Sequence, residues 1–178
     1  MSPEPLAFLH CPRCGTKVEG AVNTVPFTCA ACGLVYYFNV AVSVAALILR
    51  ADGRGLFIRR AREPAKGKLA MVGGFVDTGE TLEGALRREV REEVNLEIAA
   101  LAYLGAFPNR YEYLDVVYPT LDVFFTCAAV QPDAATALDD VESVSWHEVA
   151  TVTPGELAFT SMREALAVYV GRHMRSQP

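Results

Sequence analysis

Apolar residues follow two different spacings along the chain, and these spacings predict its elements. Residues 39–49 are almost continuously apolar and β-branched, which is typical of a buried strand. Turn-forming residues follow at 51–55, and residues 56–60 predict the strand that returns from that turn. Over residues 81–94 apolar side chains instead recur every four positions, which predicts a helix with one buried face and Thr81 as its N-cap.

The second half of the chain adds further strands and a second helix. The pattern predicts strands near 97–107, 115–130 and 141–146, and a helix near 154–174. Mixed strands with two well-separated helices indicate an α/β sandwich. The composition shifts near residues 36–39, so we expect a small domain over 1–38 and a main domain over 39–178.

Four of the five cysteines form two closely spaced pairs in the small domain. The pairs are Cys11-Pro-Arg-Cys14 and Cys29-Ala-Ala-Cys32, and a glycine follows each. The two thiolates of such a pair converge across a tight turn, and four thiolates make the tetrahedral set that zinc prefers. Disulfides are the alternative, but nothing in the sequence suggests secretion. A stretch this short can hardly fold without a cross-link or a bound metal. We therefore expect a structural Zn²⁺ in a small zinc ribbon.

Composition and charge exclude several classes of protein. Hydrophobic residues make up 52% of the chain, which excludes disorder. The net charge of −5 makes nucleic acid an unexpected partner. The longest apolar run, residues 40–49, is far shorter than the roughly 20 residues that a membrane helix needs. No signal peptide is visible, so we expect a cytoplasmic protein without a membrane partner.

Carboxylates occupy an unusual place on the predicted helix at 81–94. Glu89 and Glu93 lie one turn apart at the border of the apolar face, and Glu92 lies beside them. Carboxylates placed there are costly unless a cation neutralises them, and oxygen ligands favour Mg²⁺ or Mn²⁺. The alternative is a solvated run of charges over residues 87–93 that pair with one another along the helix.

The residues around this helix decide between the two interpretations. Gly74, then Glu80 after five residues, then Arg88-Glu-Val-Arg-Glu-Glu-Val-Asn-Leu96 after seven more, resemble the Nudix box. That box reads G, five residues, E, seven residues, R-E-U-x-E-E-x-G-U, where U is bulky and aliphatic. Asn95 replaces the usual glycine, and asparagine tolerates the left-handed end of a helix. The resemblance implies an α/β fold of the Nudix type, an α/β/α sandwich with a mixed sheet.

The resemblance also implies residue roles. The metal ligands would be Glu92, Glu93, Glu89 and the backbone carbonyl of Gly73, with Glu89 as a third ligand or as the base that activates water. Arg88 would orient these catalytic carboxylates, and Gly74 and Glu80 would be structural. A further acid is expected six residues before Trp146. That position is Asp140, with Glu142 as the neighbour that could replace it.

The reaction implied by the resemblance is attack of water on a nucleoside diphosphate linked to another group. It needs Mg²⁺ or Mn²⁺, and the substrate would be of the ADP-ribose, NADH or dinucleoside polyphosphate class. The resemblance further implies a homodimer. The alternative is a nucleotide-sensing module, or one that binds RNA or protein through the ribbon; retention of all the box acids argues against it.

Substrate recognition is expected beyond the box. A zinc ribbon ahead of a Nudix domain is similar to NADH pyrophosphatases, but residues 106–113 keep only Pro108 of their S-Q-P-W-P-F-P-x-S signature. Just before the box, Val72 replaces the proline of the frequent W-x-L-P-G-G sequence. We expect Arg110, Tyr111 and Tyr113 to bind substrate by phosphate pairing and base stacking. The alternative is that the tyrosines pack the sandwich edge.

Overall fold

The computed structural model of the chain describes residues 8–19, 26–114 and 116–174. The chain divides into two compact units at the junction between Asn39 and Val40. No helix in the described part of the chain is long and apolar enough to cross a membrane.

The first unit is held by very little apolar material. Its two-residue strands β1 (Phe27–Thr28) and β2 (Val35–Tyr36) pair antiparallel. Phe8 packs against Phe27 and Phe38, with ring centroids 5.6 and 5.0 Å apart. Its buried residues are Phe27 and the cysteines at 11 and 29. A core of this size does not stabilise a fold without a cross-link or a metal.

The second unit is built on a seven-stranded mixed sheet. Its strands are β3 (Ala41–Leu49), β4 (Arg54–Arg60), β5 (Leu69–Ala70), β6 (Val72–Phe75), β7 (Ile98–Tyr113), β8 (Val116–Ala129) and β9 (Val141–Glu148). β3 lies at the centre, parallel to β8 and antiparallel to β4 and β6. β7 pairs with β8, while β5 and β9 pair with β4.

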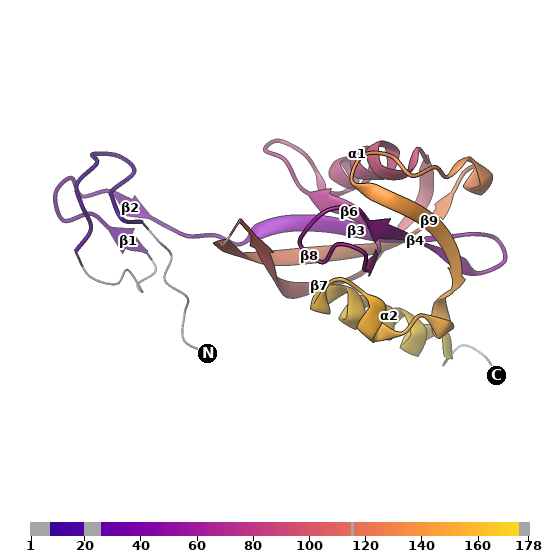
Figure 1. Cartoon of the computed structure of the whole chain (residues 1–178). Helices are drawn as coiled ribbons and strands as arrows, with labels where there is room; N and C mark the ends of the chain where they lie inside the picture. Colours follow the sequence, from indigo (N-terminus) through magenta and orange to yellow (C-terminus); the bar gives the residue numbers. More distant parts are fainter. Residues whose placement is uncertain (1–7, 20–25, 115, 175–178) are drawn as a thin grey trace. The chain divides into compact units, whose positions relative to one another are not determined.

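Helices cover both faces of this sheet. α1 (Leu82–Val94) lies over one face and α2 (Thr160–Met174) over the other, as Figure 1 shows. Short 3₁₀ helices occur at Pro132–Ala134, Val149–Thr151 and Pro154–Glu156. The expected α/β/α sandwich with a mixed sheet is therefore confirmed.

The predicted helix is found with its predicted ends. The Thr81 hydroxyl accepts a hydrogen bond from the Gly84 N–H at 3.1 Å, so Thr81 is the N-cap. Asn95 ends the helix in the left-handed conformation, with φ of 55° and ψ of 38°. The apolar face is buried over Leu86, Val90 and Val94, as the four-residue spacing predicts.

Two predicted boundaries differ from the structure. β7 runs on to Tyr113 and pairs with β8 as far as Val116, so the tyrosines expected in a connection lie on a long β-hairpin. The last helix begins at Thr160 rather than near 154, because Pro154 opens a separate 3₁₀ turn. Cys127 is a buried residue of β8, and burial raises the pKa of its thiol to about 12.

Candidate active site

The loop before α1 brings the backbone against the carboxylates of the helix. Gly73 and Gly74 lie in β6, opposite Ala45 and Val44 of β3. Gly73 has φ of 152°, and a Cβ there would collide with the Val44 carbonyl oxygen. A Cβ on Gly74 would collide with the Glu89 carboxylate. Position 73 therefore requires glycine for the strand to approach β3 this closely, whereas a side chain at position 74 would displace the Glu89 carboxylate.

Arg88 binds several acceptors around it. Its Nε and Nη2 donate to the two carboxylate oxygens of Glu80, both at 2.8 Å, which is the bidentate fork of arginine and carboxylate. Its Nη1 donates to Glu89 at 2.7 Å and to Glu92 at 3.2 Å, and its Nη2 also donates to the Phe75 carbonyl at 3.1 Å. The fork holds the pKa of Glu80 down at about 2. Glu80 is thus an ionised structural partner that fixes Arg88.

Glu93 is the most deeply placed of the box acids. Its Oε2 accepts a hydrogen bond from the Gly73 N–H at 3.1 Å. Burial raises its pKa to about 8, and the nearby Glu89 carboxylate adds to the rise. Burial likewise raises the pKa of Glu89, although the Arg88 guanidinium opposes it. Two partly buried acids that resist ionisation in this way are characteristic of a functional site.

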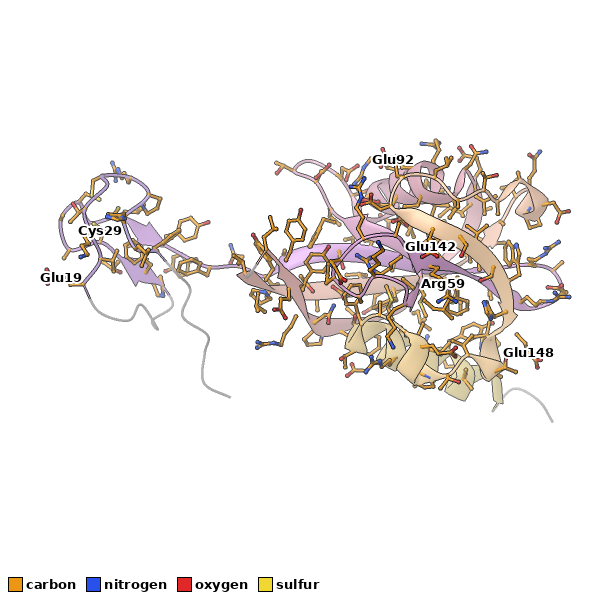
Figure 2. All side chains as sticks on the ribbon, in the orientation of Figure 1. Glu19, Cys29, Arg59, Glu92, Glu142 and Glu148 are labelled. Carbon is orange, nitrogen blue, oxygen red and sulfur yellow. The ribbon has the colours of Figure 1, made fainter. Side chains whose placement is uncertain are left out.

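The remaining acids differ in where they lie. Glu92 is half exposed on α1 and Glu142 is exposed on β9 (Figure 2). Asp140 lies beside the site, where it contributes to the raised pKa of Glu93 and pairs with Arg62 at 2.8 Å. Asp140 lines the cavity described next, and Glu142 does not.

A cavity of about 280 Å³ opens beside these acids, and its lining joins two kinds of surface. Glu89, Glu93 and Gly73 border one part of it. The aromatic rings of Phe75, Tyr111 and Phe159 also line it. Tyr111 lies 5.3 Å from Phe75 and 5.8 Å from Phe159, measured between ring centroids.

A buried polar cluster completes the lining of this cavity and was not found from the sequence. Asp122 is only 6% exposed, and its carboxylate accepts four hydrogen bonds. The donors are Ser43, Asn109, Thr120 and Ser161. A signal was present, because Asp122 interrupts the apolar residues of β8 where a buried strand ordinarily carries no charge.

The three residues expected to bind substrate are not all brought to the cavity. Tyr111 lines it together with Asn109. Arg110 lies between them in β7 and is exposed, since successive side chains of a strand point to opposite faces. Tyr113 lies beside Tyr111, at a centroid distance of 6.4 Å, but is itself half exposed at the end of the strand and does not line the cavity.

Metal ligation has two candidate places. The sulfur atoms of Cys11, Cys14, Cys29 and Cys32 all lie within 4.8 Å of one another, the tightest grouping of potential ligands within the described ranges. Two of the sulfur pairs are 3.8 and 3.7 Å apart. A Zn–S bond of about 2.3 Å in tetrahedral geometry implies sulfur separations of about 3.8 Å, so the cluster has the dimensions of a zinc site.

The backbone of this cluster fits the same ion. Gly15 and Gly33 follow the cysteine pairs with φ of 72° and 71°, as expected for two tight turns. Hydrogen bonding with Thr16 lowers the pKa of Cys14 to about 6 and backbone N–H groups lower the pKa of Cys29, whereas burial and the neighbouring cysteines raise the pKa of Cys32 to about 11. Thiolates are the species that bind zinc.

The second candidate place is the acidic end of the cavity. Its donors are carboxylate oxygens, the ligands that Mg²⁺ and Mn²⁺ prefer. Glu89 lines this end of the cavity and Glu92 does not, but both carboxylates contact the Arg88 guanidinium. The donor set thus fits a hard divalent ion, with Glu93 as its most buried member.

Comparisons with known proteins agree with this site. The model of the NUDIX domain family matches residues 40–168. The chain is 27% identical over 166 residues to the NAD-capped RNA hydrolase NudC of Pseudomonas aeruginosa, covering 91% of this chain and 55% of that protein. It is 28% identical to the human mitochondrial NAD(P)H pyrophosphatase NUDT13, over 88% of this chain and 44% of that protein. The chain thus spans about half the length of the curated relatives it matches.

A solved structure shows the same fold. A NUDIX hydrolase from Nitrosomonas europaea superposes with a TM-score of 0.70 at 22% identity, and the match covers 95% of this chain and 94% of that one. The loop, the capped helix and the box acids around Arg88 occupy the matched domain. This chain belongs to the Nudix hydrolase family.

Proposed function

We propose that this protein is a pyrophosphohydrolase that requires Mg²⁺ or Mn²⁺ and cleaves the diphosphate of an NAD-type substrate. One observation carries the proposal. The partly buried carboxylates of Glu89 and Glu93, whose pKa values are raised, border the same cavity as the aromatic rings of Tyr111 and Phe159. Such a cavity accommodates a cationic metal with a diphosphate at one end and a flat ring at the other.

In this proposal the box residues have three roles: metal binding, proton transfer and positioning of Arg88. Glu93, Glu92 and the Gly73 carbonyl would hold the metal, with Asp140 as a further ligand and Glu89 as a third carboxylate ligand or as the base. When bound, the metal would supply the positive charge that neutralises the diphosphate and a lowered pKa of the attacking water. Glu89 lies next to the Arg88 guanidinium, which keeps its carboxylate oriented for accepting a proton from that water. Glu80 fixes Arg88 and does not touch substrate.

The substrate class rests on the relatives. The names of the matched proteins refer to NAD-capped RNA and to NAD(P)H. Both contain a nucleotide joined to a second group through a diphosphate, the linkage that the proposed site would cleave. NADH is therefore the first substrate to test, with ADP-ribose and dinucleoside polyphosphates beside it. The expectation that nucleic acid is not a partner stays a prediction, and NAD-capped RNA is the substrate that tests it.

The remaining expectations are part of the same proposal. The four cysteines hold one structural Zn²⁺ that the small first unit needs in order to fold. The protein acts in the cytoplasm as a homodimer. The dimer is tested by light scattering of the full chain, and a monomeric mass at micromolar concentration would contradict it.

The test of the function is a hydrolysis panel with Mg²⁺ or Mn²⁺ on NADH, NAD⁺, ADP-ribose, FAD and diadenosine polyphosphates. Chromatography of the products identifies the bond that is cleaved, and NADH should give AMP and reduced nicotinamide mononucleotide. The Glu93→Gln variant is the blank. Turnover that this variant retains, or the absence of turnover on every member of the panel, would refute the proposal for these substrates.

A further inference from the structure

The buried Asp122 carboxylate has no capacity left for a ligand. Its Oδ1 accepts hydrogen bonds from the hydroxyls of Ser43 and Thr120, both at 2.7 Å. Its Oδ2 accepts from the Asn109 amide at 2.8 Å and from the Ser161 hydroxyl at 2.6 Å. A carboxylate offers about four lone-pair sites, and all four are used here. Asp122 therefore organises its neighbours rather than contacting substrate itself.

The sheet and a helix together build this arrangement. Ser43 lies opposite Asp122 on β3, and Asn109 lies opposite Thr120 on β7, so three strands place their polar groups on one face. Ser161 reaches the same carboxylate from α2 and is fully buried. Each group is held from a different element, so the cluster is rigid as well as satisfied.

The carboxylate fixes the direction of every hydrogen bond around it. A hydroxyl carries one proton, and the Ser43 and Thr120 protons are both directed at Asp122, which leaves only lone pairs for the cavity. The Asn109 amide must turn its NH₂ group to the carboxylate, because a carboxylate cannot donate. The carbonyl oxygen of Asn109 and the second N–H of its amide are then left for a ligand.

Three of the four donors line the cavity, and the fourth does not. Ser43, Asn109 and Thr120 border it, while Ser161 lies behind them. The polar floor formed by Ser43, Asn109 and Thr120 consequently presents the lone pairs of two hydroxyls and the Asn109 carbonyl oxygen, beside one unused N–H of Asn109; we call it the acceptor floor. It lies in the same cavity as the ring of Tyr111, an apolar surface for a flat ligand, and as the ring of Phe159, over which the Arg60 guanidinium lies at 5.2 Å.

We propose that this acceptor floor selects the exocyclic amino group of the substrate's nucleobase, and so discriminates amino purines from their deaminated counterparts. The inference rests on the proposed function and names its specificity. An amino group offers two N–H donors to the floor. The carbonyl oxygen that replaces it in hypoxanthine is an acceptor, so it would form no hydrogen bond with the Ser43 and Thr120 hydroxyls, whose protons are directed at Asp122.

The test uses two substrates that differ at this one group. The kcat/KM for NADH is compared with that for reduced nicotinamide hypoxanthine dinucleotide, and NADH is expected to be better by about tenfold or more. Dissociation constants of AMP and IMP, measured by calorimetry on the full chain, should differ in the same direction. Equal values for both pairs, within twofold, would overturn the inference.

Two variants test whether the preference depends on the direction of the hydrogen bonds in the floor or only on an intact cluster. Asp122→Asn brings N–H donors into the cluster, which releases hydroxyl protons toward the cavity, so the preference for the amino substrate should fall to about twofold or less. Ser161→Ala removes one hydrogen bond from the same carboxylate and leaves its charge unchanged, so the preference should persist. A preference that Asp122→Asn retains in full would contradict the proposed role of Asp122.

The two proposals fail in distinguishable ways. If neither dinucleotide is hydrolysed but AMP binds about tenfold tighter than IMP, the hydrolase is refuted and the acceptor floor stands. If both dinucleotides are hydrolysed equally and both nucleotides bind equally, the hydrolase stands and the floor is refuted. The wild-type comparison is sufficient even where Asp122→Asn does not fold.

Discussion

Arg88 shows at the scale of a single residue how the box works. The guanidinium forms a fork with Glu80 and also reaches Glu89, Glu92 and the Phe75 carbonyl. A lysine carries the same charge but has no fork to bind both oxygens of Glu80 while reaching the other acceptors. Position 88 therefore requires arginine for its geometry and not only for its charge.

We predict that Arg88→Lys lowers kcat for NADH by about tenfold or more, because the orientation of Glu89 is lost. Arg91→Lys on the same helix is the control, since Arg91 pairs with the exposed Glu97 outside the cavity. Steady-state kinetics with Mn²⁺ measures both variants. Equal losses in the two variants would contradict the role given to Arg88.

Glu93 predicts a pH dependence of stability. Burial raises its pKa to about 8 in the folded chain, above the ordinary value of about 4.5 that applies when the chain unfolds. A raised pKa means that the folded state binds the extra proton, so this stabilisation is present in full below pH about 4.5 and is lost as the pH rises through about 8. Glu89 contributes in the same direction.

For protein free of Mg²⁺ and Mn²⁺, we therefore expect the Tm of the wild type to fall relative to that of Glu93→Gln between pH 5 and 9. Differential scanning calorimetry across that range measures the difference between the two proteins. A difference in Tm that stays constant with pH would show that Glu93 does not titrate as its burial requires.

Elements that depend on neighbouring residues could be predicted from the sequence, and elements that depend on distant residues could not. α1 could be predicted with both its ends, because Thr81, the apolar spacing and Asn95 act within the helix itself. The long β7–β8 hairpin could not, since its length depends on pairing between residues 98–113 and 116–129. The 3₁₀ turn at Pro154–Glu156 could not be predicted either, because Leu157, which follows it, is buried and pairs with the distant Leu69.

The same distinction applies to the residues of the candidate site. The box residues follow from their spacing, whereas the cluster around Asp122 draws on β3, β7, β8 and α2 and has no spacing of its own. The sequence marks only Asp122 as out of place among apolar neighbours. Arg110 was expected at the substrate. It lies outside the cavity lining because successive side chains of a strand point to opposite faces, and its neighbours Asn109 and Tyr111 line the cavity.

The left-handed C-cap of α1 predicts which substitutions of Asn95 lower the stability of the fold. Asn95 adopts φ of 55°, which glycine tolerates and β-branched residues do not. We expect Asn95→Gly to change the free energy of unfolding by less than about 0.5 kcal/mol, and Asn95→Val to lower it by about 1–2 kcal/mol. Urea denaturation measures both. Equal stability of the two variants would contradict the left-handed cap.

At the scale of the whole molecule, the two units differ in what stabilises them. The second unit has a continuous core over the sheet and both helices, while the first has a few aromatic rings and four cysteines. Hydrophobic burial is therefore sufficient to fold the second unit, whereas the described part of the first unit has too little of it without a cross-link or an ion at its cysteines.

We predict that the purified chain contains one zinc per molecule and that Cys14→Ser lowers this content to about one fifth or less, since three thiolates leave the tetrahedral set incomplete. Elemental analysis by mass spectrometry measures it. Cys127→Ser is the matched control, because this cysteine lies in the core of the second unit. Equal zinc content in both variants would refute the assignment.

The most direct test of the account is the initial rate of NADH hydrolysis as a function of Mn²⁺, compared between Glu93→Gln and Glu83→Gln. Both glutamates lie on α1, and Glu83 is exposed in its first turn, outside the cavity. We predict that Glu83→Gln keeps the Mn²⁺-dependent rate and that in Glu93→Gln this rate is lower by about 100-fold or more. A Glu93→Gln rate equal to that of Glu83→Gln, or a wild-type rate independent of Mn²⁺ and Mg²⁺, would contradict this prediction.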